Sequence, residues 1–120
     1  MTKKILIIDD EPDILKVIVY RLKKLNYEVI TAVSGEGAID LIKKEMPNLI
    51  FLDLRLPKIN GDEICLNIKA DSSISGIPVI LITASSNNIA EITKNCKADD
   101  YCLKPFTPEE LIAKTEKYIK

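Results

Sequence analysis

Three short segments of the chain are continuously apolar, and they constrain the fold more than any other feature. They are residues 5–8, 49–52 and 79–82. A strand with one face in water alternates apolar and polar residues, whereas a parallel strand covered on both faces reads as an unbroken apolar run. The three runs therefore predict central strands of a parallel sheet with helices on both faces. Two weaker segments, 28–32 and 101–103, suit its edges.

Helical patterns lie between and after these strands. The apolar positions expected to face the core are Ile14, Val17, Ile18, Leu22 and Leu25 in the first helix, Ala38, Leu41 and Ile42 in the second, Ile64 and Ile68 in the third, and Leu111, Ile112 and Ile119 in the last. The fourth segment, 88–96, carries few apolar residues. Pro12 suits the first turn of a helix. Thr107, Pro108 and Glu110 have the spacing of an N-cap, a first-turn proline and a capping box.

Strands and helices thus alternate as five βα units within 120 residues, without a linker or repeat. Right-handed crossovers between parallel strands produce an α/β sheet wrapped by helices. A closed eight-unit barrel needs about twice this length. The sequence predicts one α/β domain over residues 1–120, built on an open, doubly wound, five-stranded parallel sheet.

Composition excludes several classes of function. The net charge is −1 and the basic residues are scattered, so we expect no direct nucleic-acid binding. No apolar run has the length of a membrane span and the N-terminus lacks a secretory pattern, which favours a cytoplasmic protein without membrane contact. Cys65, Cys96 and Cys102 form no C-x-x-C pair, so we expect reduced thiols rather than a disulfide or zinc site.

Polar residues stand directly after the strands, where each predicted strand ends. The residues in these positions are Asp9, Asp53, Thr83 and Lys104. The carboxyl ends of parallel strands lie along one edge of a sheet, and ligands of open α/β folds bind at that edge. One such residue could stand there by chance, but the same placement on four strands indicates a functional site.

The acids of this site require a cation. Asp9, Asp10 and Asp53 are expected to converge from two neighbouring strands, and carboxylates held close together repel unless a proton or cation joins them. Mg²⁺ takes one or two carboxylates together with waters and phosphate oxygens. Thr83 and Lys104 add donors on the far side. The set suits transfer of a phosphoryl group to a carboxylate.

Each residue by itself has an ordinary structural explanation. The acids at 9–11 suit the N-terminus of a helix, whose dipole stabilises them, and Asp53 suits a turn or cap. Lys104 and Arg55 are by default solvated charges, and Tyr101 is an amphipathic edge-strand residue. The functional interpretation rests on the joint pattern.

Four motifs also carry a resemblance. With them the chain resembles the response-regulator receiver family, of the chemotaxis CheY type, over its whole length. Each motif is short, but together, in this order and at this spacing, they are specific. The matching segments are residues 7–12 (IIDDEP), 52–57 (LDLRLP) with Asn60 and Gly61, 83–84 (TA), and 99–106 (DDYCLKPF).

The resemblance implies a flavodoxin-like strand order of 2-1-3-4-5. It implies that Asp53 accepts a phosphoryl group from a histidine kinase or a histidine phosphotransfer protein. Asp10, Asp53 and the backbone carbonyl of Arg55 would ligate Mg²⁺, and Asp9 would assist through water. The activity expected is self-phosphorylation and slow autodephosphorylation, without turnover of a substrate.

The resemblance also implies a switch and an output surface. Thr83 and Lys104 would contact the phosphoryl oxygens, Tyr101 would be the aromatic switch residue, and the Lys104–Pro105 peptide would be cis. The fourth helix, fifth strand and fifth helix would form the output face, for an unknown partner or a phosphorylation-dependent homodimer. Receivers often have Gly where Lys97 stands, and residues 83–104 span about one residue fewer than usual. Both departures fall on the fourth helix.

Two rival functions share the architecture. A phosphatase of the haloacid-dehalogenase type would need a D-x-D motif, but Asp53-Leu54-Arg55 lacks the second Asp. A flavin-mononucleotide binder would need a phosphate loop after the first strand, where this chain has three acids. Within the receiver family, the sequence fits a stand-alone protein or the N-terminal receiver of a longer DNA-binding or enzymatic regulator.

Overall fold

The computed structural model of the chain describes residues 2–85 and 87–119, and these form five βα units. The elements are β1 (Lys4–Ile8), α1 (Pro12–Lys24), β2 (Glu28–Ala32), α2 (Ala38–Glu45), β3 (Leu49–Asp53), α3 (Gly61–Ala70), β4 (Val79–Thr83), α4 (Ile89–Asn95), β5 (Asp100–Leu103) and α5 (Pro108–Tyr118). All strands pair in parallel, in the order β2-β1-β3-β4-β5. The predicted fold class and strand order are confirmed.

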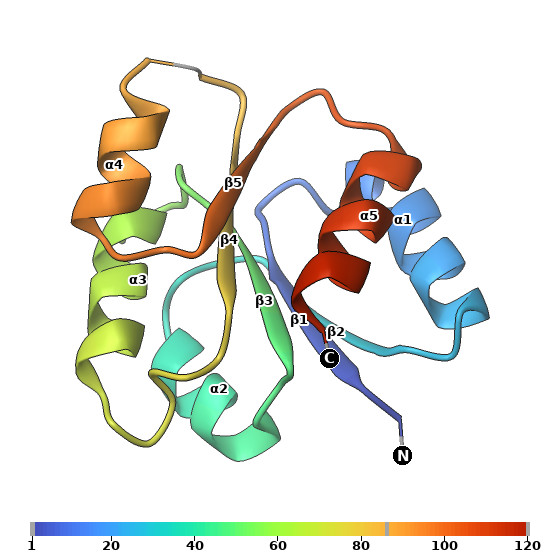
Figure 1. Cartoon of the computed structure of the whole chain (residues 1–120), viewed down its shortest axis with the longest axis horizontal. Coiled ribbons are helices and arrows are strands. Elements are labelled where there is room, and N and C mark those ends of the chain that lie inside the picture. Colours follow the sequence, from blue (N-terminus) through green and yellow to red (C-terminus); the bar gives the residue numbers. More distant parts are fainter. Residues whose placement is uncertain (1, 86, 120) are drawn as a thin grey trace.

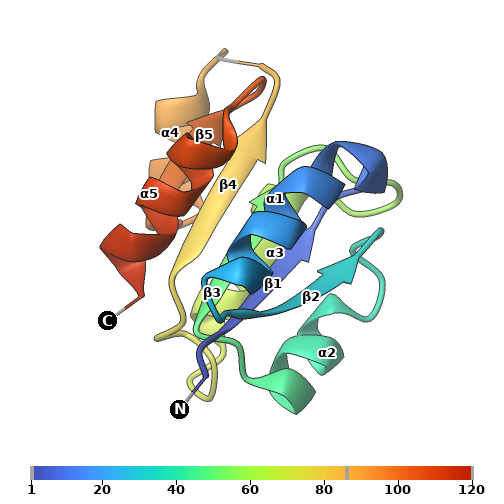
Figure 2. The same cartoon turned by 90° about the vertical axis from the view of Figure 1, so that its right-hand side faces the viewer.

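The continuous apolar runs are explained by helices on both faces of the sheet. Ile5 and Ile7 of β1 pack on the face covered by α1 and α5, whereas Leu6 and Ile8 pack on the face covered by α2, α3 and α4. Strands β3 and β4 alternate in the same way. Figures 1 and 2 show the two helical layers with the sheet between them. Because the side chains on both faces of the sheet enter the core, the central strands are apolar at every one of these positions.

The predicted buried stripe of α1 is partly wrong. Val17 and Leu25 are 60% and 50% exposed, while Leu15, Ile18 and Leu22 are buried. Apolar residues occupy more than one side of this helix, and only the side at positions 15, 18 and 22 meets the sheet. The Ile14 side chain lies outside the described part of the structure.

The other helices follow their patterns more closely. Ala38 and Ile42 of α2 and Ile64 and Ile68 of α3 are buried as predicted. At the start of α5, the Thr107 hydroxyl accepts a hydrogen bond from the Glu110 backbone N–H at 3.2 Å, as its N-cap spacing predicts. The Lys104–Pro105 peptide is cis. No helix within residues 2–85 and 87–119 is both long and apolar enough to cross a membrane.

Helix α4 is the least anchored helix, and its exit turn is unusual. It covers Ile89–Asn95, one residue less at each end than predicted, and Ile89 is its buried residue. The turn after it places Lys97 in the left-handed region, with φ of 63°. A residue with a Cβ is strained there, whereas Gly is not. Lys97 therefore builds this turn at some cost in backbone strain.

We expect Lys97→Gly to increase the free energy of unfolding by about 0.5–1 kcal/mol, because it removes this strain at some cost in chain entropy. Lys94→Gly, in the last turn of α4, is the matched control and should lower stability by about 1 kcal/mol. Urea unfolding measures both. Equal loss of stability in the two variants would contradict the strain at residue 97.

Candidate functional site

The register of the sheet brings the four predicted strand-end residues to one edge. Ile8 is aligned with Leu52, so the next residues on β1 and β3, Asp9 and Asp53, lie level with each other. Asp53 is aligned with Ile82, which places Thr83 one step further along. The Lys104 backbone N–H donates to the Thr83 carbonyl at 2.7 Å and continues the ladder from β5. Backbone pairing alone therefore gathers these side chains.

Four carboxylates form a cluster at this edge. One oxygen from each of Asp9, Asp10, Glu11 and Asp53 lies within 4.8 Å of the others. Asp9 and Asp53 are buried, and Asp10 and Glu11 are exposed. Glu11 was missing from the predicted ligand set, although its position next to Asp10 could have indicated it. The turn is held by Asp9, whose Oδ1 accepts from the Glu11 backbone N–H at 2.9 Å.

Lys104 is the cation at the centre of this cluster. Its Nζ lies 2.9 Å from Asp9 Oδ2, 3.1 Å from Asp53 Oδ2 and 3.7 Å from Glu11 Oε1. Burial would lower the pKa of this ammonium group, but hydrogen bonds to Asp9 and Asp53 outweigh burial and raise its pKa above the usual value. Lys104 is therefore firmly protonated, and it bridges the two buried acids.

Asp53 is held in one orientation, but its contacts do not fully balance the negative charge of its carboxylate. Its Oδ1 accepts from the Arg55 backbone N–H at 3.0 Å, and its Oδ2 accepts from Lys104. Burial raises the pKa of Asp53 above its ordinary value, although the bonds from Arg55 and Lys104 oppose this shift. Oxygen-only donors that include buried acids fit a hard divalent cation. The residues present thus suit Mg²⁺.

A cleft of about 250 Å³ opens over Asp53. It is lined by Asp10, Glu11, Asp53, Arg55, Thr83, Ala84 and Lys104. The Thr83 oxygen accepts from the Ser85 backbone N–H at 3.2 Å, so the hydroxyl keeps its own proton to donate. The cleft thus presents a carboxylate, an ammonium group and a hydroxyl to whatever enters it.

Two predicted site residues do not line this cleft, Asp9, which reaches it only through its contact with Lys104, and Tyr101. The Tyr101 residue lies on β5. Its side chain is partly buried and packs against the core cluster beneath α2, α3 and α4. Ile92 and Ala98 pack against the same cluster. Tyr101 is thus close to the α4 side of the sheet, and its role as a switch stays a prediction.

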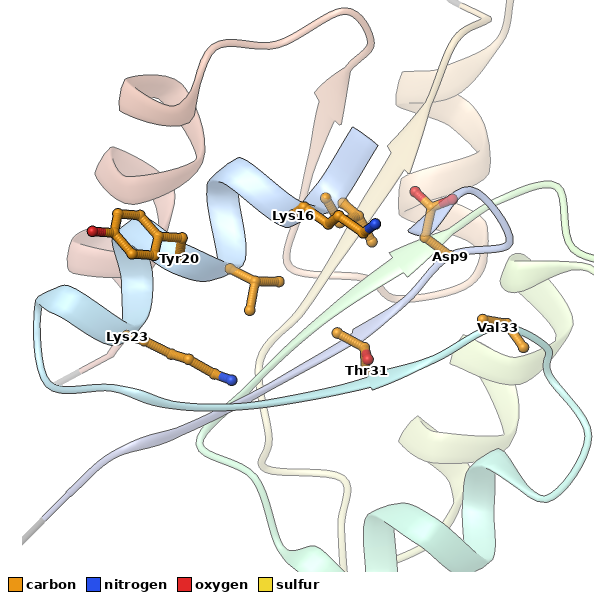
Figure 3. A pocket seen from close by; sticks show the side chains of 8 residues that line it. Asp9, Lys16, Tyr20, Lys23, Thr31 and Val33 are labelled. Carbon is orange, nitrogen blue, oxygen red and sulfur yellow. The ribbon is translucent and has the colours of Figure 1, made fainter. Parts of the chain in front are cut away.

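A second, larger cleft of about 380 Å³ lies between α1 and β2. Figure 3 shows Lys16, Tyr20 and Lys23 extending from α1 across from Thr31 of β2, with Asp9 at one end. Its walls are mainly apolar, and Asp9 is the carboxylate it shares with the acidic cluster. The donors and acceptors needed for phosphoryl chemistry converge in the smaller cleft.

Gly61 lies in close backbone contact with the loop that follows Asp53. Its backbone N–H donates to the Leu54 carbonyl at 2.8 Å, which brings the start of α3 against the loop. A Cβ at residue 61 would lie 2.9 Å from the Leu54 Cα and collide with the Asp53 carbonyl group. Only glycine permits this approach. The sequence places Gly61 in a motif but does not reveal this contact.

We expect Gly61→Ala to lower the free energy of unfolding by about 3 kcal/mol, because backbone atoms on both sides of the collision must shift. Replacing Gly by Ala at an open position of a helix would instead stabilise the fold. Gly76→Ala is the matched control, since a Cβ there meets nothing within 4 Å, and it should change stability by less than about 0.5 kcal/mol. Thermal unfolding compares them, and equal midpoints would contradict the close approach.

Comparison with known proteins assigns the chain and its fold to one family. Residues 5–116 match the family profile of the response regulator receiver domain. "Probable transcriptional regulator ycf27" of Porphyridium aerugineum is 40% identical over 119 residues, which are 98% of this chain and 48% of that protein. The alkaline phosphatase synthesis transcriptional regulatory protein PhoP of Bacillus subtilis is 36% identical, over 100% of this chain and 50% of its own. The chain thus spans about half the length of these relatives.

Solved structures agree with the sequence relatives. The chemotaxis response regulator CheY4 of Vibrio cholerae superposes with a TM-score of 0.89 at 25% identity, covering 98% of this chain and 99% of that one. A CheY-like receiver domain protein of Methanospirillum hungatei gives a TM-score of 0.88 at 31% identity, covering 99% and 94%. This chain belongs to the response regulator receiver domain family of two-component signalling.

Proposed function

We propose that Asp53 is the phosphoacceptor of this receiver and takes a phosphoryl group from the phosphohistidine of a histidine kinase or phosphotransfer protein. One observation carries the proposal. Asp53 is a buried carboxylate at the end of β3 that faces a cleft, contacts Lys104 and forms a cluster with three more acids. Membership of the receiver family supports the same partners.

The reaction is an in-line displacement at phosphorus. A carboxylate oxygen of Asp53 attacks the phosphorus atom and forms a P–O bond while the P–N bond to the donor histidine breaks. The bonding pair returns to the imidazole nitrogen, which takes up a proton. The Lys104 ammonium group and the Thr83 hydroxyl both reach the cleft, and they would donate to the equatorial oxygens as negative charge develops there.

Asp10, Asp53 and the backbone carbonyl of Arg55 would hold Mg²⁺, with Asp9 assisting through water. The acidic cluster supports this set, and Glu11 is close enough to contribute. When bound, the ion would neutralise charge on the phosphoryl oxygens and keep the acids ionised. Lys104 would hold Asp9 and Asp53 in their orientations through its two short contacts.

Phosphorylation would be transmitted towards α4. The Thr83 hydroxyl would turn to a phosphoryl oxygen and leave space beside β4 that the Tyr101 ring could enter. The weak anchoring of α4, through Ile89 and the adjoining Cys96, supports movement of this segment. The face formed by α4, β5 and α5 would then bind an output partner or a second copy of the chain.

Residues 1–120 would act as one cytoplasmic receiver domain, alone or within a longer regulator. The relatives with twice its length are named as transcriptional regulators, which supports the second arrangement. The chain itself would show no substrate turnover beyond gaining and slowly losing its own phosphoryl group.

The test is to incubate the protein with a small acyl-phosphate donor, with Mg²⁺ or with a chelator, and to measure its intact mass. We expect one added phosphoryl group, removable by hydroxylamine because it is an acyl phosphate, and little labelling without Mg²⁺. Labelling of a hydroxyl side chain would refute the assignment. Repeated turnover of a generic phosphate ester would favour the phosphatase alternative.

A further inference from the structure

Two of the three cysteines contact each other in the core cluster on the α2, α3 and α4 side of the sheet. Cys65 lies in α3 and Cys96 directly after α4, and both are buried in the same core cluster. The Cys65 thiol donates to the Cys96 backbone carbonyl at 3.3 Å, and the Cys96 thiol donates to the Thr93 backbone carbonyl at 3.7 Å. Both thiols are free. A core contact between two helices is thus made by two oxidisable groups.

The surroundings of the pair activate one sulfur. The neighbouring Cys65 thiol, together with the Ala98 backbone N–H, lowers the pKa of Cys96 to about 7 although burial opposes the shift. The same contact and burial raise the pKa of Cys65. A thiol with a pKa near the ambient pH is the most effective attacking thiol, because it combines thiolate population with nucleophilicity.

We propose that Cys65 and Cys96 form a reversible disulfide that ties the end of α4 to α3. A disulfide needs its sulfur atoms about 2 Å apart, and the Cys65 sulfur already reaches the backbone of Cys96. The modification requires no phosphoryl group, so it is independent of the function proposed for Asp53.

Forming the disulfide requires a two-electron oxidant, and we propose that a peroxide supplies it. The Cys96 thiolate attacks one peroxide oxygen, the O–O bond breaks, and a sulfenic acid and hydroxide form. The Cys65 sulfur then attacks the sulfenic sulfur and gives up its thiol proton to the departing hydroxyl group, so that the S–S bond forms and the second oxygen leaves as water. Two thiols and one hydrogen peroxide thus give one disulfide and two waters.

The position of the pair explains why the bond would matter. Helix α4 has seven residues, and its described buried contacts are Ile89 at the start and Cys96 just past the end. Local opening of so weakly anchored a segment would admit a small oxidant. Once formed, the disulfide would replace the contact at one end of α4 with a covalent tether, and the segment would open less often.

Cys102 provides an internal control. It is also buried, but it lies on β5 in the opposite core cluster, on the side of α1 and α5. Under native conditions we expect hydrogen peroxide to leave one of the three thiols free, and peptide mapping without reductant to join Cys65 to Cys96. Cys102→Ser should preserve the bridge, whereas Cys65→Ser and Cys96→Ser should abolish it.

The effect on α4 is read from amide hydrogen exchange. Exchange across residues 89–98 should slow by about tenfold or more in the oxidised wild type, and dithiothreitol should reverse the change. Three free thiols after treatment, or a bridge that includes Cys102, would overturn the proposal. So would a bridge that forms only in urea, or one that leaves exchange in α4 unchanged. The mapping uses wild-type protein and does not depend on any variant folding.

Discussion

Asp53→Asn should abolish labelling by an acyl-phosphate donor, a loss of at least about 10³-fold, because the amide keeps the shape of the side chain but removes the nucleophile. Asp13→Asn is the matched control. Asp13 lies in the first turn of α1, and its side chain is 90% exposed. It should be labelled like the wild type. Intact mass spectrometry compares the three proteins, and undiminished labelling of Asp53→Asn would place the acceptor elsewhere.

The same substitution should stabilise the fold. Burial raises the pKa of Asp53 in the folded state. The protonated side chain therefore contributes stability to the fold that is fully present below the unfolded pKa. This contribution is lost as pH rises through the folded pKa. At neutral pH, without divalent cations, the ionised side chain therefore lowers stability. Asp53→Asn removes that charge and should raise the unfolding midpoint, whereas at pH below the unfolded pKa the gain should vanish. A lower midpoint at neutral pH would contradict the burial effect.

The sequence predicted the sheet better than the helices. Residues 5–8, 49–52 and 79–82 are apolar at every position because each strand is covered on two faces. That requirement leaves an unbroken signal. Helix α1 has apolar residues on several sides, and spacing alone did not reveal that Leu15, rather than Val17, meets the sheet. The order of the strands came from the resemblance, since periodicity identifies a strand but not its neighbours.

The site was predictable where it depends on backbone register. Four side chains gather at one edge because their residues end or directly follow aligned parallel strands: Asp9, Asp53, Thr83 and Lys104. The contacts between different units were not predictable in this way. The approach of Gly61 to the Asp53 loop joins the end of one element to the start of another across a loop. The Cys65–Cys96 contact likewise joins positions 31 residues apart, and no local pattern records it.

Lys104→Met should weaken phosphorylation but strengthen Mg²⁺ binding. The ammonium group contacts Asp9 and Asp53 at 2.9 and 3.1 Å, so it repels any cation that the same carboxylates bind. A unit charge a few ångströms from a divalent ion contributes more than about 1 kcal/mol even in water, so its removal should increase Mg²⁺ affinity about tenfold or more. Labelling should fall about 10²-fold, because one donor to the transferring group is lost.

Stability gives an independent readout of the same change. Without divalent cations, Lys104→Met leaves two buried acids unpaired, and the free energy of unfolding should fall by about 2–3 kcal/mol, somewhat less than for a fully dry ion pair because the cleft admits water. Mg²⁺ binds the folded state and should restore more stability in Lys104→Met than in the wild type.

Lys43→Met is the matched control for Lys104→Met. It breaks a 2.8 Å ion pair between the last turn of α2 and Asp71, the C-cap of α3, neither residue belongs to the acidic cluster, and Lys43 is half exposed. Its Mg²⁺ affinity and labelling should equal those of the wild type. Isothermal titration measures the affinities, and Asp10→Ala should shift them in the opposite direction from Lys104→Met. If Lys104→Met bound Mg²⁺ more weakly than the wild type, then Lys104 would not compete with the cation for Asp9 and Asp53.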